Sequence, residues 1–193
     1  MVHMDAMQRI GTAGAAHAVV VDAVVHAVVD SPVGPVVVAV EDGAVTHLRL
    51  PRTDGGPAAD AVGERVVPED DPVLAEAVRQ LTAYFAGDLR EFDLPLRYAG
   101  TAFQRRVWDG LRQVPYGTTT SYGALAAAVG LDPRTTARAV GAANGANRMA
   151  IVVPCHRVIG AGGKLVGFAA GLDRKRTLLE LERRATGGPA LLF

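Results

Sequence analysis

The sequence predicts an α/β protein with two parts: a small N-terminal domain of antiparallel strands and one helix, then a mainly helical domain. Three observations lead to this prediction. Runs of β-branched residues separated by Pro and Gly turns fill positions 21–50, and apolar residues at helical spacing follow Asp71. Two short helical patterns flank Gly130, which is the spacing of a helix-turn-helix. At 193 residues and 49% apolar content, the chain can bury a core in one domain or in two.

The N-terminal domain is expected to span residues 21–98, after a flexible leader over 1–20. We predict its strands over 21–30, 36–40 and 45–50, joined by turns at 31–35 and 41–43 where Pro and Gly set the backbone. Residues 51–70 are rich in Pro, Gly and Asp and indicate an exposed loop. A short extended segment is expected at 94–96.

Asp71-Pro72 begins the one helix expected in this domain, because a capping acid followed by Pro favours a helix start. The pattern continues to about Phe85. Its apolar residues recur at helical spacing and predict one buried face, made of Val73, Leu74, Ala77, Val78, Leu81 and Phe85.

The second domain is expected over residues 101–184 and opens with three helices. Thr101 caps a helix over 102–113, and Ser121 caps one that runs to 129 and ends at Gly130. Asp132-Pro133 starts the third, which runs to about Asn144. Helix, short Gly-containing turn and helix predict a helix-turn-helix.

The rest of the domain contains the only cysteine of the chain. The apolar run 149–153 predicts a buried strand that ends at Pro154, so that Cys155 lies at its mouth beside His156. The glycine-rich stretch 160–164 indicates a hairpin or wing. A final helix is expected over 173–184, and residues 185–193 are expected to form a flexible tail.

Charge is unevenly distributed, although the net charge is zero. Residues 1–100 hold 7 basic and 15 acidic side chains, whereas residues 101–193 hold 13 and 5. A basic half beside an acidic half is typical of a localised face that binds a polyanion. Electrostatic pairing between the two halves is the alternative, and the two interpretations are compatible.

Composition also limits the class of protein. A single cysteine excludes an internal disulfide and fits a reducing compartment, so we expect a cytoplasmic protein, associated with the nucleoid if the source is bacterial. No uninterrupted apolar stretch has membrane-spanning length. We expect no metal site and no cofactor, because the histidines outside the Cys-His pair lack ligand-like spacing: His3, His17, His26 and His47.

A thiol beside a potential base suits nucleophilic catalysis, since the thiolate is the reactive form; a buried structural cysteine is the alternative. The flanking residues decide between them. The stretches 138–144, 151–158 and 167–172, with Asn147, resemble the methylated-DNA–protein-cysteine methyltransferases in order and spacing. The upstream stretches 103–108, 114–117 and 120–126 also resemble that family. The resemblance covers residues 24–184 and is densest from 101 to 182.

Members of this family remove alkyl groups from the 6-oxygen of guanine in DNA, and each molecule reacts once. The resemblance therefore implies an N-terminal ribonuclease H-like domain, a winged helix-turn-helix domain and direct-reversal repair. It implies that Cys155 is the nucleophile and that His156 takes the thiol proton through a water. Glu182 would orient His156, with Glu180 as its competitor, and Asn147 would brace the helix-turn-helix against the active-site strand.

The resemblance also implies how the damaged base is held. The guanine 6-oxygen faces the base-paired stack, so the base must be flipped out before a thiol can reach it. Tyr122 would push on the adjacent phosphate and contact the flipped base. Four further residues would complete the pocket: Val158, Phe168, Ala169 and Ala170. Arg157 is expected to be structural and to pack on the active-site strand.

The expected partner is double-stranded DNA that contains alkylated guanine. Small residues on the 133–144 helix cannot read base edges, but they let a helix approach the minor groove; that they are ordinary helix formers is the alternative. The resemblance places this helix in the minor groove, with Arg138 filling the gap left by the flipped base. The other contact residues would be Thr135, Ala137, Ala139, Gly141 and Ala142. We expect a monomer, and cooperative assembly on DNA stays open.

Three other functions fit the sequence less well. A non-catalytic protein that binds alkylguanine lesions would lack the reactive cysteine, which this chain has. A transcriptional sensor of methylation would add a cysteine-rich zinc module, which one cysteine excludes. A Cys-His hydrolase would need an oxyanion site that no motif indicates.

Overall fold

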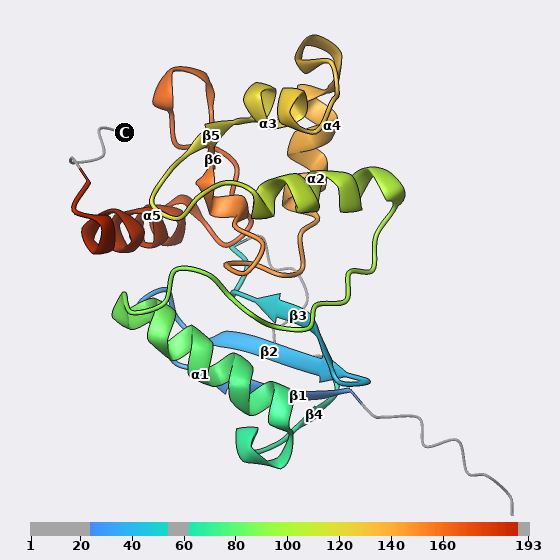
Figure 1. Ribbon diagram of the computed structural model, residues 1–193, viewed down its shortest axis with the longest axis vertical. Helices are drawn as coiled ribbons and strands as arrows, with labels where there is room; N and C mark the ends of the chain where they lie inside the picture. Colours follow the sequence, from blue (N-terminus) through green and yellow to red (C-terminus); the bar gives the residue numbers. More distant parts are fainter. Residues whose placement is uncertain (1–23, 54–61, 189–193) are drawn as a thin grey trace, which may run out of the picture.

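The computed structural model describes residues 24–53 and 62–188, which form two parts arranged one above the other (Figure 1). The predicted fold class is confirmed: a sheet with one helix is followed by a mainly helical domain. The proposed leader over 1–20 lies outside the described residues, as do the last residues of the proposed tail. No helix of the described segments is long and apolar enough to cross a membrane.

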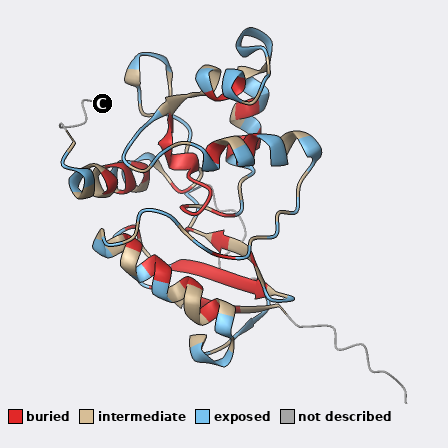
Figure 2. Ribbon diagram, viewed as in Figure 1, coloured by how far each residue is buried: buried red, intermediate tan, exposed pale blue. Residues whose placement is uncertain are grey.

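The N-terminal sheet has the strand order β3-β2-β1-β4. The strands β1 (Val25–Val29), β2 (Val36–Glu41) and β3 (Ala44–Arg49) form an antiparallel meander. They agree with the predicted strands, apart from the first residues of β1's predicted range, which are not described. The central strand β2 is buried on both faces, as Figure 2 shows, and this explains its continuous run of apolar residues.

The predicted loop over 51–70 is partly wrong. Within it, β4 (Glu64–Arg65) pairs with β1 in parallel, and a 3-10 turn covers Pro68–Asp70. The pairing consists of backbone hydrogen bonds, from Glu64 N to Val24 O at 2.8 Å and from Val66 N to His26 O at 3.0 Å. A strand of two exposed residues has no side-chain periodicity, so composition could not reveal it.

Helix α1 (Pro72–Ala86) begins where the sequence predicted, because the Asp71 carboxylate accepts a hydrogen bond from Leu74 N at 2.8 Å. It packs on β1 and β2 through its predicted apolar stripe. Its buried residues are Leu74, Ala77, Gln80, Leu81 and Tyr84. Gln80 and Tyr84 were not in the predicted face, and Tyr84 reaches the second domain.

The second domain contains α2 (Ala102–Arg112), α3 (Tyr122–Ala128), α4 (Pro133–Gly145) and α5 (Leu172–Thr186). The caps Thr101, Ser121 and Asp132 all act as predicted, each accepting a backbone N–H of the helix that it precedes. Helices α3 and α4 pack together as the helix-turn-helix. The strands β5 (Thr120–Ser121) and β6 (Val158–Ile159) form a short parallel pair.

The predicted strand over 149–153 is wrong. The segment is a tight turn in which Val153 N donates to Met149 O at 2.8 Å, and Ile151 has φ +75°. Its apolar side chains are buried, as expected, but burial in a turn gives the same sequence pattern as burial in a strand. The predicted hairpin over 160–164 is a closed turn, with Gly160 N donating to Lys164 O at 2.8 Å.

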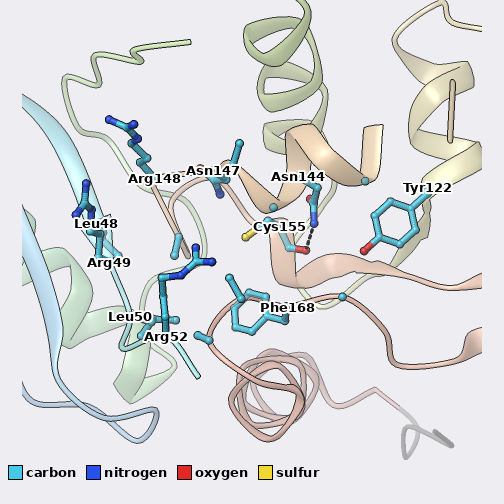
Figure 3. A pocket seen from close by; sticks show the side chains of 17 residues that line it. Leu48, Arg49, Leu50, Arg52, Tyr122, Asn144, Asn147, Arg148, Cys155 and Phe168 are labelled. Atoms are coloured by element: carbon cyan, nitrogen blue, oxygen red, sulfur yellow. Dashed lines mark hydrogen bonds between the residues drawn. The ribbon is translucent and has the colours of Figure 1, made fainter. Parts of the chain in front are cut away.

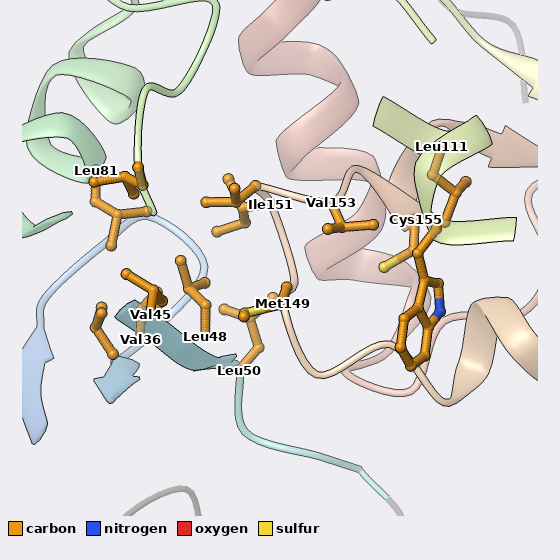
Figure 4. Close-up of a cluster of buried hydrophobic side chains, with 14 of the residues drawn as sticks. Val36, Val45, Leu48, Leu50, Leu81, Leu111, Met149, Ile151, Val153 and Cys155 are labelled. Atoms are coloured by element: carbon orange, nitrogen blue, oxygen red, sulfur yellow. The ribbon is translucent and has the colours of Figure 1, made fainter. Parts of the chain in front are cut away.

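The turn over residues 149–153 joins the two domains. Strand β3 lies at the edge of the sheet, and its Leu48 pairs with the turn: Leu48 N donates to Arg148 O at 2.8 Å, and Ala150 N donates to Leu48 O at 2.9 Å. Figure 4 shows apolar side chains from both domains meeting at this seam, among them Leu48, Met149 and Ile151. The segment that leads to Cys155 is therefore held by the N-terminal sheet.

Candidate active site

Cys155 lies in the wall of a cavity of about 650 Å³ between the two domains. It opens a 3-10 turn, Cys155–Arg157, directly after Pro154. Figure 3 shows its sulfur between Asn147 and Tyr122, with Phe168 below. The residue is only 6% exposed, so a reactant can reach the thiol only through the cavity.

Asn147 holds the turn that positions Cys155. Its side-chain amide donates to Val153 O at 2.8 Å, and its side-chain oxygen accepts from Met149 N at 2.9 Å. A positive φ is uncommon for a β-branched residue such as Ile151 and costs on the order of 1–3 kcal/mol. The side chain of Asn147, just after α4, therefore holds a strained turn where a strand was expected, and its bracing of the helix-turn-helix stays a prediction.

His156 is fully buried behind Cys155, and the predicted pairing with Glu182 is present: Nε2 lies 2.8 Å from Glu182 Oε1. Burial lowers the pKa of His156, and the nearby Glu182 carboxylate opposes this effect. A neutral ring that donates from Nε2 has an acceptor at Nδ1. Within the described residues this Nδ1 has no hydrogen-bond partner, so it is available to receive a proton.

Glu182 is fully buried, and its carboxylate accepts hydrogen bonds from four residues. Oε1 accepts from His156 Nε2 and from Tyr84 Oη, both at 2.8 Å, and Oε2 accepts from Gly117 N at 2.9 Å. Arg157 donates to both oxygens from Nε, at 3.2 and 3.0 Å. Burial alone would raise the carboxyl pKa, but His156 and Arg157 hold the pKa well below its usual range.

Arg157 was expected to pack on the active-site strand, and it does not. Its guanidinium pairs with Glu182, donates to Val114 O at 2.6 Å and lies 5.6 Å from the Tyr116 ring centre. It neutralises the buried carboxylate and ties the Cys155 turn to the segment before β5. Glu180, the competing candidate, instead pairs with Arg183 on the helix surface.

Lys175 was missed by the sequence analysis. It is fully buried, and its Nζ donates to Val158 O and Val166 O, both at 2.5 Å. Burial lowers its pKa to about 8, and Cys155 opposes that shift. The spacing of the buried residues of α5 was the available signal, because Lys175, Leu178, Leu179 and Glu182 share one helix face.

Burial raises the pKa of the Cys155 thiol. The side chain of Asn147 and the positive charge of Lys175 partly oppose this shift. The thiol therefore needs a base to supply thiolate at neutral pH, and His156 is its neighbour in the chain.

Four of the predicted substrate-binding residues line the cavity and one does not. Tyr122, Phe168, Ala169 and Ala170 all contribute to the lining. Gly167 leaves room for Tyr122, because a Cβ at this position would lie only 2.7 Å from Tyr122 Oη. Gly167 also has φ +56°, a conformation that favours glycine. Val158 lies outside the lining; its carbonyl accepts from Lys175 and its N–H donates to Cys155 O.

Helix α4 buries Val140, Ala143 and Asn144, and none of the predicted DNA-contacting residues is among them. Arg138 is exposed, and no ion pair involves it within the described residues. The other predicted contact residues divide into an exposed set, Thr135, Ala139 and Ala142, and a half-buried set, Ala137 and Gly141. In the described ranges, no group of three potential metal ligands occurs.

Comparison with family models finds two adjacent matches. Residues 24–98 match "6-O-methylguanine DNA methyltransferase, ribonuclease-like domain", and residues 102–184 match "6-O-methylguanine DNA methyltransferase, DNA binding domain". Together these matches include every residue of the site described above.

Individual proteins are similar over most of their length. The methylated-DNA–protein-cysteine methyltransferase of Mycolicibacterium paratuberculosis is 50% identical over 165 residues, 86% of this chain and 96% of the relative. The constitutive enzyme of that name from Bacillus subtilis is 43% identical, over 80% of this chain and 92% of its own. The crystal structure of Mycobacterium tuberculosis OGT in complex with DNA has a TM-score of 0.73 at 47% identity, covering 83% of this chain and 94% of that chain.

Glu182→Gln is expected to destabilise the protein by about 3–5 kcal/mol at neutral pH, because it leaves the buried Arg157 without its counter-charge. The measurement is urea unfolding. Glu180→Gln is the matched control on the same helix, and loss of its partly exposed pair is expected to cost no more than about 1 kcal/mol.

The same two variants test the pH dependence. The pKa of Glu182 is lowered by folding, so its stabilisation is present above the unfolded pKa of about 4.3 and is lost as pH falls towards the folded pKa. Wild type should therefore lose more stability on acidification than Glu182→Gln. A parallel decline in both proteins would show that the Glu182 carboxylate is not held ionised by the fold.

Proposed function

The chain belongs to the 6-O-methylguanine DNA methyltransferase family, and on that basis we propose that it repairs DNA by transferring an alkyl group from the 6-oxygen of guanine to Cys155. The observation that supports this most strongly is the single thiol on an interdomain cavity, backed by the His156–Glu182 pair. Relatives that share 43–50% identity carry the name of this activity.

The reaction follows from the groups around the thiol. His156 Nδ1 takes the Cys155 proton through one water, and Glu182 stabilises the charged ring that results. The thiolate attacks the alkyl carbon in line with the carbon–oxygen bond. A carbon–sulfur bond forms, the carbon–oxygen bond breaks, and the electron pair goes to the guanine oxygen. The guanine anion that results takes up one proton on its ring, which balances the proton removed from Cys155.

The product limits each molecule to one reaction. A thioether is not a leaving group at neutral pH, and Cys155 is the only cysteine in the chain. No second thiol can therefore resolve the alkylated residue, and the protein acts as a stoichiometric reagent.

The partner is duplex DNA with the damaged base flipped into the cavity. The solved complex of the Mycobacterium tuberculosis relative with DNA supports DNA binding by this chain. We infer that the exposed side of α4 enters the minor groove and that Arg138 occupies the space left by the base. Tyr122 and Phe168 would contact the base inside the cavity. We further infer that the protein acts as a monomer in the cytoplasm.

Stoichiometry tests the proposed chemistry. With excess duplex containing 6-O-methylguanine, product should stop at one equivalent, and intact-protein mass spectrometry should find one methyl group on Cys155. Cys155→Ser should bind the duplex and give no product, because a hydroxyl is a far weaker nucleophile. Continued turnover beyond one equivalent would rule out the suicide reaction.

Arg138→Ala should slow repair of duplex DNA much more than reaction with free 6-O-methylguanine base. Unstacking a base costs a few kcal/mol, so loss of the filling side chain should cost at least about tenfold in duplex. Single-turnover rates on both substrates measure the difference. Arg176→Ala, an exposed arginine of α5, is the control. Equal loss on both substrates would contradict the role assigned to Arg138.

Ala170→Gly should widen the part of the cavity that receives the alkyl group. Ala170 is 5% exposed and lines the cavity. Its φ is not positive, so alanine fits there without strain and its methyl group occupies space. The variant should react faster with 6-O-benzylguanine DNA and at an unchanged rate with the methyl substrate. A similar change on both substrates, or none, would contradict this steric account.

A further inference from the structure

Three arginines line one end of the cavity, and the proposed chemistry uses none of them. Arg49, Arg52 and Arg148 all belong to its lining. Figure 3 shows them on the side of Cys155 opposite to Tyr122. Arg49 and Arg52 come from the N-terminal domain and Arg148 from the second domain. Arg49 and Arg148 are called the rim arginines below.

The fold fixes the backbone of the two rim arginines beside one another. Arg49 is the last residue of β3, and Arg148 follows Asn147. The hydrogen bond of 2.8 Å from Leu48 N to Arg148 O joins the residue before Arg49 to Arg148 itself. Both positions thus belong to the seam that holds the 149–153 turn before Cys155. Backbone hydrogen bonds fix their place.

The rim arginines repel one another. Burial lowers the pKa of Arg49, and the charges of Arg148 and Arg52 lower it further. Neighbouring His47 adds no charge, because burial and the same two arginines Arg49 and Arg148 lower its pKa to about 4. Gathering like charges is unfavourable, so an anion bound among them would relieve the repulsion.

No carboxylate of the described chain offsets this charge. Neither Arg49 nor Arg148 forms an ion pair in the described ranges, and the described lining contains no Asp or Glu. Two other arginines of the N-terminal domain do form ion pairs: Arg79 pairs with Glu76, and Arg97 pairs with Glu41 and Asp42. The first 100 residues hold 7 basic and 15 acidic side chains, so this part of the chain has more carboxylates than its arginines need as partners.

We propose that the rim arginines bind backbone phosphate of the DNA strand whose base enters the cavity, so that the N-terminal domain also contacts DNA. This inference rests on the proposed function. A phosphodiester suits the site because its oxygens accept paired hydrogen bonds from guanidinium groups. With Tyr122 across the cavity, the rim arginines would hold the strand on the other side of the flipped nucleotide.

The direction of the side chains favours phosphate over a charged group on the alkylated base. Figure 3 shows the guanidinium groups of Arg49 and Arg148 directed away from Cys155. Arg148 is exposed and Arg49 is half-buried, as is expected of residues that meet a partner at the entrance. An anionic alkyl group would instead need its counter-charge close to the sulfur.

The test measures binding of the full chain, with Cys155→Ser in every protein to prevent reaction, to a duplex that contains 6-O-methylguanine, by fluorescence anisotropy over a series of KCl concentrations. Each phosphate contact contributes about 0.9 to the slope of log affinity against log salt. Arg49→Gln and Arg148→Gln should each lower the slope by about that amount, and the double variant by about twice as much. Arg65→Gln on β4, an exposed residue outside the lining, should keep the wild-type slope.

Charge-conserving variants separate the proposal from misfolding. Arg49→Lys with Arg148→Lys should restore most of the slope, because lysine also binds phosphate as a cation. Slopes equal to wild type in both glutamine variants would overturn the proposal. So would unchanged slopes combined with a selective loss of rate on a carboxymethylguanine duplex, since the anion would then be on the substrate. The slope needs no alkyl transfer, so a wild type that fails to repair methylguanine would contradict only the proposed function.

Discussion

The buried carboxylate of Glu182 is the interaction on which the active site depends. A charge removed from water must be paired and hydrogen-bonded, and Glu182 finds four donor residues in three separate parts of the chain. Tyr84 comes from α1, Gly117 from the segment before β5, and His156 and Arg157 from the Cys155 turn. These bonds orient the His156 ring and also hold Arg157, the next residue of the same turn. The base and the frame around the nucleophile are therefore set by the same group.

The N-terminal domain takes part in the site through its edge strand. Leu48 of β3 pairs with the turn that carries Asn147 and leads to Cys155, and Thr53 N donates to Ala169 O at 3.3 Å on the opposite wall. Arg174 connects Val33 O and Ala170 O, at 2.7 and 2.8 Å. Both the nucleophile's support and the wall near the alkyl group are thus held from the other domain. The proposed phosphate contact of the rim arginines would extend that role to DNA.

Local signals predicted the elements that local interactions determine. Helix starts at Asp71, Thr101 and Ser121 were predicted because a cap acts on the next turn of its own chain. The pairing of His156 with Glu182 followed from a family resemblance. Residues 149–153 were misassigned because burial gives a turn and a strand the same apolar pattern. The contacts of Tyr84, Arg157 and the rim arginines join segments far apart in sequence, and no short pattern records such contacts.

The protonation state of His156 decides whether this residue can receive the Cys155 proton. Transfer of that proton requires a neutral ring at neutral pH, with its proton on Nε2 facing Glu182 and an unprotonated Nδ1. Nitrogen-15 NMR of histidine-labelled protein distinguishes these forms, and the signals can be assigned with a His156→Gln variant. One protonated and one unprotonated ring nitrogen, with the proton on Nε2, is the predicted result. A doubly protonated ring at neutral pH, or a proton on Nδ1, would contradict the proposal that His156 receives the Cys155 proton.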